Sequence, residues 1–167
     1  MKPFVKKTLL VTIGVLLLAV GGFVCLAVWW IGHAEIDQSN GLTSRDAALS
    51  HCAIPLPASA HNVQYASYAA GMQEGHLYVR FEAPVADCYK TAKTIFAEHA
   101  KQNPSHYVIP KFQPTNLLDR ERSSDLRIDW FDNDKISTGV VAGTGWSWEP
   151  KIWIDEERGV LYYEVND

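Results

Sequence analysis

The sequence has few cysteines and none of the motifs that are diagnostic of a known reaction. Its only cysteines are Cys25, Cys52 and Cys88, and its six histidines show no zinc-binding spacing such as HExxH. No serine lies in a G-x-S-x-G motif, and no glycine-rich phosphate-binding loop follows an expected strand. The sequence therefore predicts no metal and no cofactor. Because catalytic triads assemble from distant positions, these absences alone leave an enzyme open.

Positive charge is scarce after the first 31 residues. Lys2, Lys6 and Lys7 are the only charged residues before residue 32, so the remaining 136 residues hold all 19 acidic residues against 12 basic ones. An acidic domain is poorly suited to the phosphate backbone, so we expect no nucleic-acid partner. A length of 167 residues allows one folded domain.

One long apolar run, Leu9 to Ile31, contains no charged residue. As a helix it would be about 34 Å long, enough for a hydrocarbon core of about 30 Å. The run predicts a cytoplasmic tail over residues 1–7 and a single transmembrane helix over 8–31, with the N-terminus inside by the positive-inside rule. A cleaved signal peptide is the alternative, although the run is longer than such segments have.

The polar residues 32–42 are expected to form a linker, and residues 43–167 an extracytoplasmic α+β domain. An apolar stripe of helical period predicts a helix from Pro84 to Gln102. Alternating apolar residues predict an antiparallel sheet of about five strands packed against this main helix. The expected strands cover 62–72, 76–82, 126–130, 151–155 and 160–165, the last two joined by a turn that ends at Gly159.

Four segments of the domain resemble a family of small uncharacterised bacterial proteins that are membrane-anchored or exported. The segments are IPLPASAHNVQY (54–65), LYVRFEAP (77–84), DWFD (129–132) and IWIDEERGVLYY (152–163). The family has no assigned activity, so the resemblance implies an intact domain and adds no mechanism. It implies a location at the cytoplasmic membrane of a bacterium, with the C-terminal domain periplasmic or extracellular.

Two groups of residues have a possible structural or chemical role. Cys52 and Cys88 would lie in a compartment that permits disulfides and are either partners in a bridge or two small buried residues. Asp129, Asp132 and Asp134 form the densest carboxylate cluster, but their spacing does not match a calcium loop of the EF-hand type. Turn chemistry explains them more simply, because Asp side chains bond to nearby backbone in turns.

Aromatic residues are concentrated near the C-terminus, and Trp153 and Tyr162 alternate with apolar neighbours so that part of this area is expected at the surface. Exposed aromatics beside acidic residues such as Glu149 resemble the centre and polar rim of an interface. The sequence predicts a non-enzymatic, membrane-anchored binding module for another envelope protein or a secreted ligand. Its expected contact residues are Arg80, Trp148, Trp153 and Tyr162. The alternative is a membrane-anchored hydrolase or metal-dependent enzyme using residues 129–134.

Overall fold

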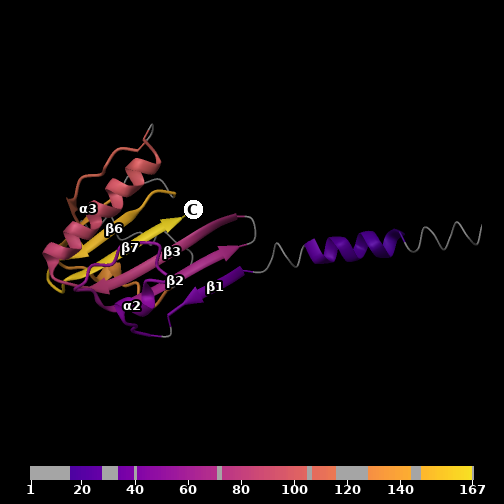
Figure 1. Ribbon diagram of the computed structural model, residues 1–167, viewed down its shortest axis with the longest axis horizontal. Coiled ribbons are helices and arrows are strands. Elements are labelled where there is room, and N and C mark those ends of the chain that lie inside the picture. The colour runs from indigo at the N-terminus through magenta and orange to yellow at the C-terminus, as the bar shows by residue number, and fades with distance from the viewer. Residues whose placement is uncertain are drawn as a thin grey trace, which may run out of the picture. The chain divides into compact units, whose positions relative to one another are not determined.

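A computed structural model describes residues 16–27, 34–39, 41–70, 73–104, 107–115, 128–143 and 148–166. Its centre is a seven-stranded antiparallel sheet with the order β1-β2-β3-β7-β6-β5-β4 (Figure 1). The prediction of about five strands is therefore wrong. The chain divides into two units, residues 1–35 with 69–73 and residues 36–68 with 74–167. The sites described below lie in the second unit.

The structure also contradicts the predicted transmembrane helix and the membrane location that depended on it. The N-terminal helix is described over residues 16–27, and none of the described helices combines the length and apolar character needed to span a bilayer. The prediction rested on an uncharged apolar run in the sequence, and the helix described over 16–27 does not bear it out. The rest of the predicted segment and the tail over 1–7 lie outside the described residues.

Two hairpins form where alternating apolar residues predicted them. They pair β2 (His61–Ala70) with β3 (Gln73–Glu82), and β6 (Lys151–Asp155) with β7 (Val160–Asn166). β3 and β7 join the hairpins into one sheet, with Val79 opposite Tyr163. Gly159 closes the second turn at φ +65°, where an added Cβ would lie 2.7 Å from the Ala83 carbonyl oxygen.

Three strands lie where none was predicted. They are β1 (Ala34–Gln38), inside the expected linker, the two-residue edge strand β4 (Gln113–Pro114), and β5 (Gly139–Ala142). The sequence was interpreted as irregular at β5 because of its glycines. Glycine is required at position 139, because a Cβ there would collide with the Ile154 carbonyl oxygen of β6. Residues 128–130 of the expected strand at 126–130 lie in no strand, and residues 126–127 lie outside the described part.

The main helix α3 (Val85–Gln102) begins and ends close to the predicted bounds, and Figure 1 shows it alongside β6 and β7. Its buried residues Cys88, Ala92, Ile95 and Phe96 pack on the sheet face that carries Val79, Phe81, Ile152, Ile154 and Leu161. A second helix, α2 (Arg45–Ala48), is capped by the hydroxyl of Ser44, which accepts a hydrogen bond from the Ala47 N–H. The domain is thus a seven-stranded antiparallel sheet with α3 on one face, which corrects the predicted fold of about five strands behind a transmembrane helix.

The opposite face of the sheet is covered too, by residues 128–138, which include the short 3-10 helix Asn133–Lys135. Phe131 of this loop meets three rings of the sheet edge-on, with centroid separations of 5.2 Å to Tyr78, 5.9 Å to Trp153 and 5.5 Å to Tyr162. Both faces of the C-terminal hairpin β6–β7 are therefore inside the domain.

Candidate functional site

Of the four predicted contact residues, only Trp148 is exposed. Trp153 and Tyr162 are fully buried beneath the 128–138 loop. The two residues are paired across β6 and β7, and the face that they share is covered by Phe131 and its neighbours. Because buried rings cannot contact a partner, neither residue belongs to a surface site. Trp148, which precedes β6, keeps 42% of its surface exposed.

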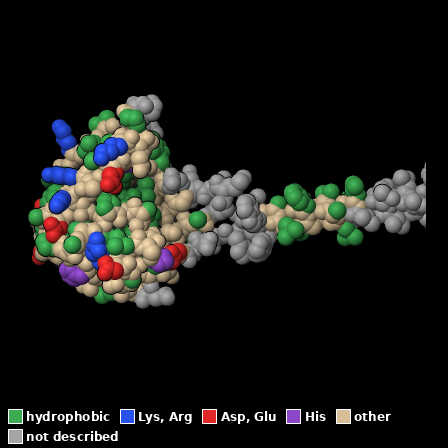
Figure 2. Space-filling view, viewed as in Figure 1, with side chains coloured by type: hydrophobic (Ala, Val, Ile, Leu, Met, Phe, Trp, Pro, Cys, Tyr) green, Lys and Arg blue, Asp and Glu red, His purple; other side chains and the backbone are tan. Residues whose placement is uncertain are grey.

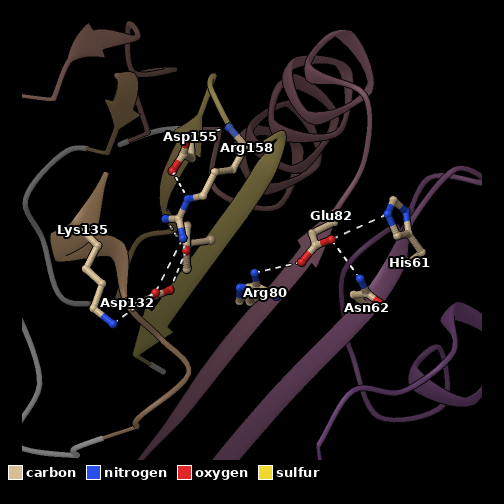
Figure 3. Close-up of polar contacts among 9 residues, drawn as sticks. His61, Asn62, Arg80, Glu82, Asp132, Lys135, Asp155 and Arg158 are labelled. Atoms are coloured by element: carbon tan, nitrogen blue, oxygen red, sulfur yellow. Dashed lines mark hydrogen bonds and ion pairs between the residues drawn. The ribbon is translucent and has the colours of Figure 1, made fainter. Parts of the chain in front are cut away.

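Arg80 has partners within the sheet. Its Nη2 donates to Glu82 Oε1 at 3.0 Å, and its guanidinium carbon lies 5.9 Å from the centre of the Tyr162 ring. Glu82 also accepts a 2.8 Å hydrogen bond from the Asn62 side chain and lies near His61 (Figure 3). Burial alone would raise the pKa of the Glu82 carboxyl, but the bonds from Asn62 and Arg80 outweigh burial and lower it. Arg80 therefore stabilises the β2–β3 region.

A second polar network connects the 128–138 loop to the turn between β6 and β7. Arg158 bonds to Asp155 through Nε at 2.5 Å and lies 3.6 Å from Asp132 through Nη1 (Figure 3). Asp155 accepts two further bonds from the backbone N–H groups of the turn, at 3.0 and 2.9 Å. Tyr162 donates to Asp132 Oδ1 at 2.7 Å and accepts from Arg158 at 3.1 Å.

The charges in this network are stabilised by their neighbours. Burial alone would raise the pKa of the Asp132 carboxyl, but the Tyr162 hydroxyl and the charges of Arg158 and Lys135 outweigh burial and lower it. Burial and the hydrogen bond to Asp132 raise the pKa of Tyr162 to about 12. Asp132, a member of the predicted carboxylate cluster, thus forms contacts that hold the loop on the sheet.

The described residues contain no group of three or more His, Cys, Asp or Glu side chains that could hold a metal ion. Asp129 is exposed and Asp134 half-buried. The hydrolase or metal-enzyme alternative at residues 129–134 stays a prediction, and the contacts of Asp132 give it no support.

The two cysteines outside the N-terminal helix carry free thiols in the structure and are both buried in the core beneath α3. Burial, followed by the nearby charge of Asp37, raises the pKa of Cys52 to about 12. Burial, followed by the charge of Asp87, raises the pKa of Cys88 to about 11. Thiols with such pKa values stay protonated at neutral pH, so neither cysteine is a nucleophile in this environment.

A different group of polar residues lies at the C-terminal end of α3. The rings of His99, in the last turn of α3, and Tyr107 meet edge-on with centroids 4.6 Å apart. Glu149 is 5% exposed and Tyr107 is 9% exposed. Within the described part of the chain, neither Glu149 Oε2 nor the Tyr107 hydroxyl has a hydrogen-bond partner. Buried polar groups are nearly always paired, so two such groups together require an explanation.

The pKa shifts place these three side chains within electrostatic reach of one another. Burial raises the pKa of the Glu149 carboxyl, and the nearby charge of His99 opposes this only in part. Burial and the charge of Glu149 raise the pKa of Tyr107. The charged form of the buried Glu149 carboxyl is therefore compensated only in part, by His99. Glu149 was expected on the polar rim of an interface. Its burial was not predicted, because burial of this kind depends on packing between segments that are distant in the sequence.

Exposed apolar side chains adjoin this group in the chain. Val108 and Ile109, which follow Tyr107, are 77% and 54% exposed, and Trp148 precedes Glu149. We call Val108, Ile109 and Trp148 the Trp148 surface. Figure 2 shows hydrophobic side chains at the surface in several places among charged ones. Leu42 and Leu49 are the other exposed large apolar residues in the described part of this unit, and they lie next to α2.

Comparison of the chain with protein-family models, curated proteins and solved structures finds no match. The family resemblance seen in the sequence therefore stays a prediction, and the geometry alone carries the functional argument.

Proposed function

We propose that the folded domain is a protein-binding module that contacts its partner through the Trp148 surface. The observation that supports this is the exposure of Val108, Ile109 and Trp148, which adjoin Tyr107 and Glu149 in the chain, two buried side chains with a polar atom that has no partner among the described residues. Exposed apolar residues around a few well-placed polar groups are the composition of a binding site. Tryptophan is also among the residues that contribute most to binding energy at protein interfaces.

A binding role fits the described residues better than an enzymatic one. Asp132, the central carboxylate of the region suggested for catalysis, is joined to Arg158, Lys135 and Tyr162, and burial raises the pKa of the two thiols in the core well above neutrality. By contrast, Trp148 is one of the predicted contact residues and is the one that the fold leaves accessible.

The test is a crosslinked pull-down of the full-length protein from the cells that express it, comparing the wild type with Trp148→Ala. A partner of this surface is recovered in stoichiometric amount with the wild type and lost with the variant, because removing a central tryptophan costs about 2 kcal/mol or more of binding. Leu42→Ser is the matched control, since Leu42 is an exposed apolar residue outside the Trp148 surface. Equal recovery with Trp148→Ala and the wild type would contradict the proposal.

A further inference from the structure

The basic side chains of the domain differ in whether a carboxylate lies within ion-pair distance. Those with a carboxylate partner are Arg45 with Asp46, Arg80 with Glu82, Lys135 with Asp132, and Arg158 with Asp155. The ammonium of Lys151 lies 4.9 Å from the centre of the Trp153 ring. In the described part of the chain, the remaining basic residues of the domain form no ion pair; they are Lys90, Lys93, Lys101 and Lys111.

Three of these unpaired lysines lie on one side of α3. Lys90, Lys93 and Lys101 are all exposed. At 3.6 residues per turn they fall within about 80° of one another around the helix axis, and Lys90 and Lys101 are about 16 Å apart along it. This side is opposite to the one that buries Cys88 and Ala92 against the sheet.

The fourth unpaired lysine belongs to a segment that packs against the same helix. Lys111 is exposed and precedes Phe112, whose ring lies 5.0 Å from that of Tyr89 and 6.3 Å from that of Phe96, both on α3. In the shared view of Figures 1 and 2, Lys and Arg side chains gather on the side of the domain where α3 lies. We call this set the lysine face: Lys90, Lys93, Lys101 and Lys111.

The acidic side chains on α3 and beside it do not pair with the lysine face. Asp87 and Glu156 accept hydrogen bonds from uncharged hydroxyl groups. Glu98 precedes Lys101 by three residues, a spacing that allows an ion pair on a helix, but among the described contacts the two form none. The ammonium groups of the lysine face are therefore free to pair with carboxylates from outside the domain.

We propose that the lysine face binds an acidic segment of a partner protein, whose carboxylates pair with Lys90, Lys93 and Lys101. This inference is independent of the proposed function, because it uses no residue of the Trp148 surface. An extended segment of about five residues covers the 16 Å between the outer lysines of α3. Charges in solution are screened beyond about 8 Å at physiological ionic strength, so the local lysines outweigh the net charge of −4.

An acidic protein segment fits this face better than a nucleic acid or a lipid surface. A nucleic acid extends beyond the face and meets a domain in which acidic residues outnumber basic ones. Helices that bind lipid surfaces insert large apolar side chains, and within the described part of α3 no large apolar residue is exposed. Residues 116–127 of this chain carry three acidic and three basic side chains, so they supply no net negative charge.

The experiment measures the binding of two peptides to the full-length protein by fluorescence anisotropy. The first is a blocked eight-residue peptide of alternating glutamate and serine with a rhodamine label, and the second has glutamine in place of each glutamate. At about 20 mM salt, we expect the glutamate peptide to bind at least about tenfold more tightly than the glutamine peptide. At about 300 mM salt the difference should shrink several-fold, because salt screens exposed charges.

The variants assign this preference to α3. Lys90→Gln, Lys93→Gln and Lys101→Gln should each reduce the preference about two- to threefold, and the triple variant should abolish it. Lys135→Gln is the matched control, since it makes the same charge change on the sheet face opposite α3 and should leave the preference unchanged. Glu98→Gln removes an acid beside the face and should raise the affinity about twofold. Glutamine is a good helix former, and thermal melts check that each variant is folded.

Three kinds of result would overturn the inference. Equal binding of the two peptides, or binding of neither, would reject a site for carboxylates. A preference that survives the triple variant, or that Lys135→Gln reduces as much as the single α3 variants do, would assign it to other residues or to net charge. Oligothymidylate, or vesicles containing phosphatidylserine, that bind more tightly than the glutamate peptide and lose binding in the triple variant would replace the acidic segment as the occupant.

Discussion

Two sets of acidic side chains in the domain differ in how their oxygens are satisfied. Asp132 and Asp155 accept hydrogen bonds from Tyr162, Arg158 and the turn backbone. Oε2 of Glu149, like Oδ1 of Asp134, is buried and has no partner among the described residues. The first set holds the loop to the sheet. In the second set, the charge of Glu149 is compensated only in part, by His99.

The difference teaches how to separate structural acids from candidate functional ones in this molecule. A buried carboxylate that is paired and bonded contributes to stability, and losing its partners is costly. A buried carboxylate without partners reduces stability, so its presence in a folded protein requires an explanation, of which a bound ligand is one. Substitutions in the two sets should therefore change the free energy of unfolding with opposite signs.

The largest effect is expected for Asp155→Ala. The substitution removes three hydrogen bonds and leaves Arg158 without its closest carboxylate, so we expect a loss of about 3 kcal/mol in the free energy of unfolding. Urea unfolding at neutral pH measures it. Lys135→Ala is the control within the same network, because its exposed ion pair with Asp132 contributes only about 0.5 kcal/mol. Equal urea midpoints for the two variants would contradict this prediction, because they would mean that Asp155 stabilises the fold no more than Lys135 does.

A smaller loss is expected for Tyr162→Phe, which deletes one hydroxyl and keeps the buried ring. Asp132 loses a 2.7 Å bond and Arg158 an acceptor, which amounts to about 1–2 kcal/mol. Because the folded protein lowers the pKa of Asp132, the stability that its charge contributes is present above its ordinary value of 3.8 and is lost as the pH falls through the folded pKa. The difference in the free energy of unfolding between the variant and the wild type should therefore become smaller at acidic pH. Urea unfolding across pH 2–7 tests this. A constant difference would mean that the hydroxyl does not act through the Asp132 charge.

The smallest effect, and the one of opposite sign, is expected for Glu149→Gln in the absence of a partner. The folded protein raises the pKa of Glu149, so the wild type is most stable below the ordinary value of 4.5 and loses stability as the pH rises through the folded pKa. The neutral amide does not titrate, so the variant should be about 1 kcal/mol more stable than the wild type at pH 8 and equal to it at pH 4. Thermal melts at the two pH values measure this. If the variant is less stable than the wild type at pH 8, the prediction is wrong and Glu149 stabilises the fold as Asp132 and Asp155 do.

Much of the fold follows from local pattern. Alternation predicted the two hairpins, and the apolar stripe predicted α3 within one residue of its start. β1 and β5 were missed because pairing with β2 and β6 forms them, in segments whose polar or glycine-rich composition indicates no strand. The transmembrane prediction rested on the lack of charge in the sequence, and none of the described helices bears it out.

The candidate site was only partly accessible to sequence reasoning. Trp148 was predicted as a contact residue and is exposed, whereas Trp153 and Tyr162 are buried by the 128–138 loop, of which only residues 128–130 were expected to belong to a strand. The role of Glu149 depends on Tyr107 and His99, which are distant in the chain, so no local pattern indicates it.

The edge strand β4 has a consequence for how copies of the protein behave at high concentration. It is only two residues long, and its Pro114, paired with Val140, has no backbone N–H to offer to another strand. Short strands and prolines at a sheet edge prevent sheets of neighbouring molecules from joining edge to edge. At this border of the sheet the fold therefore resists the strand-to-strand growth from which fibrous aggregates develop.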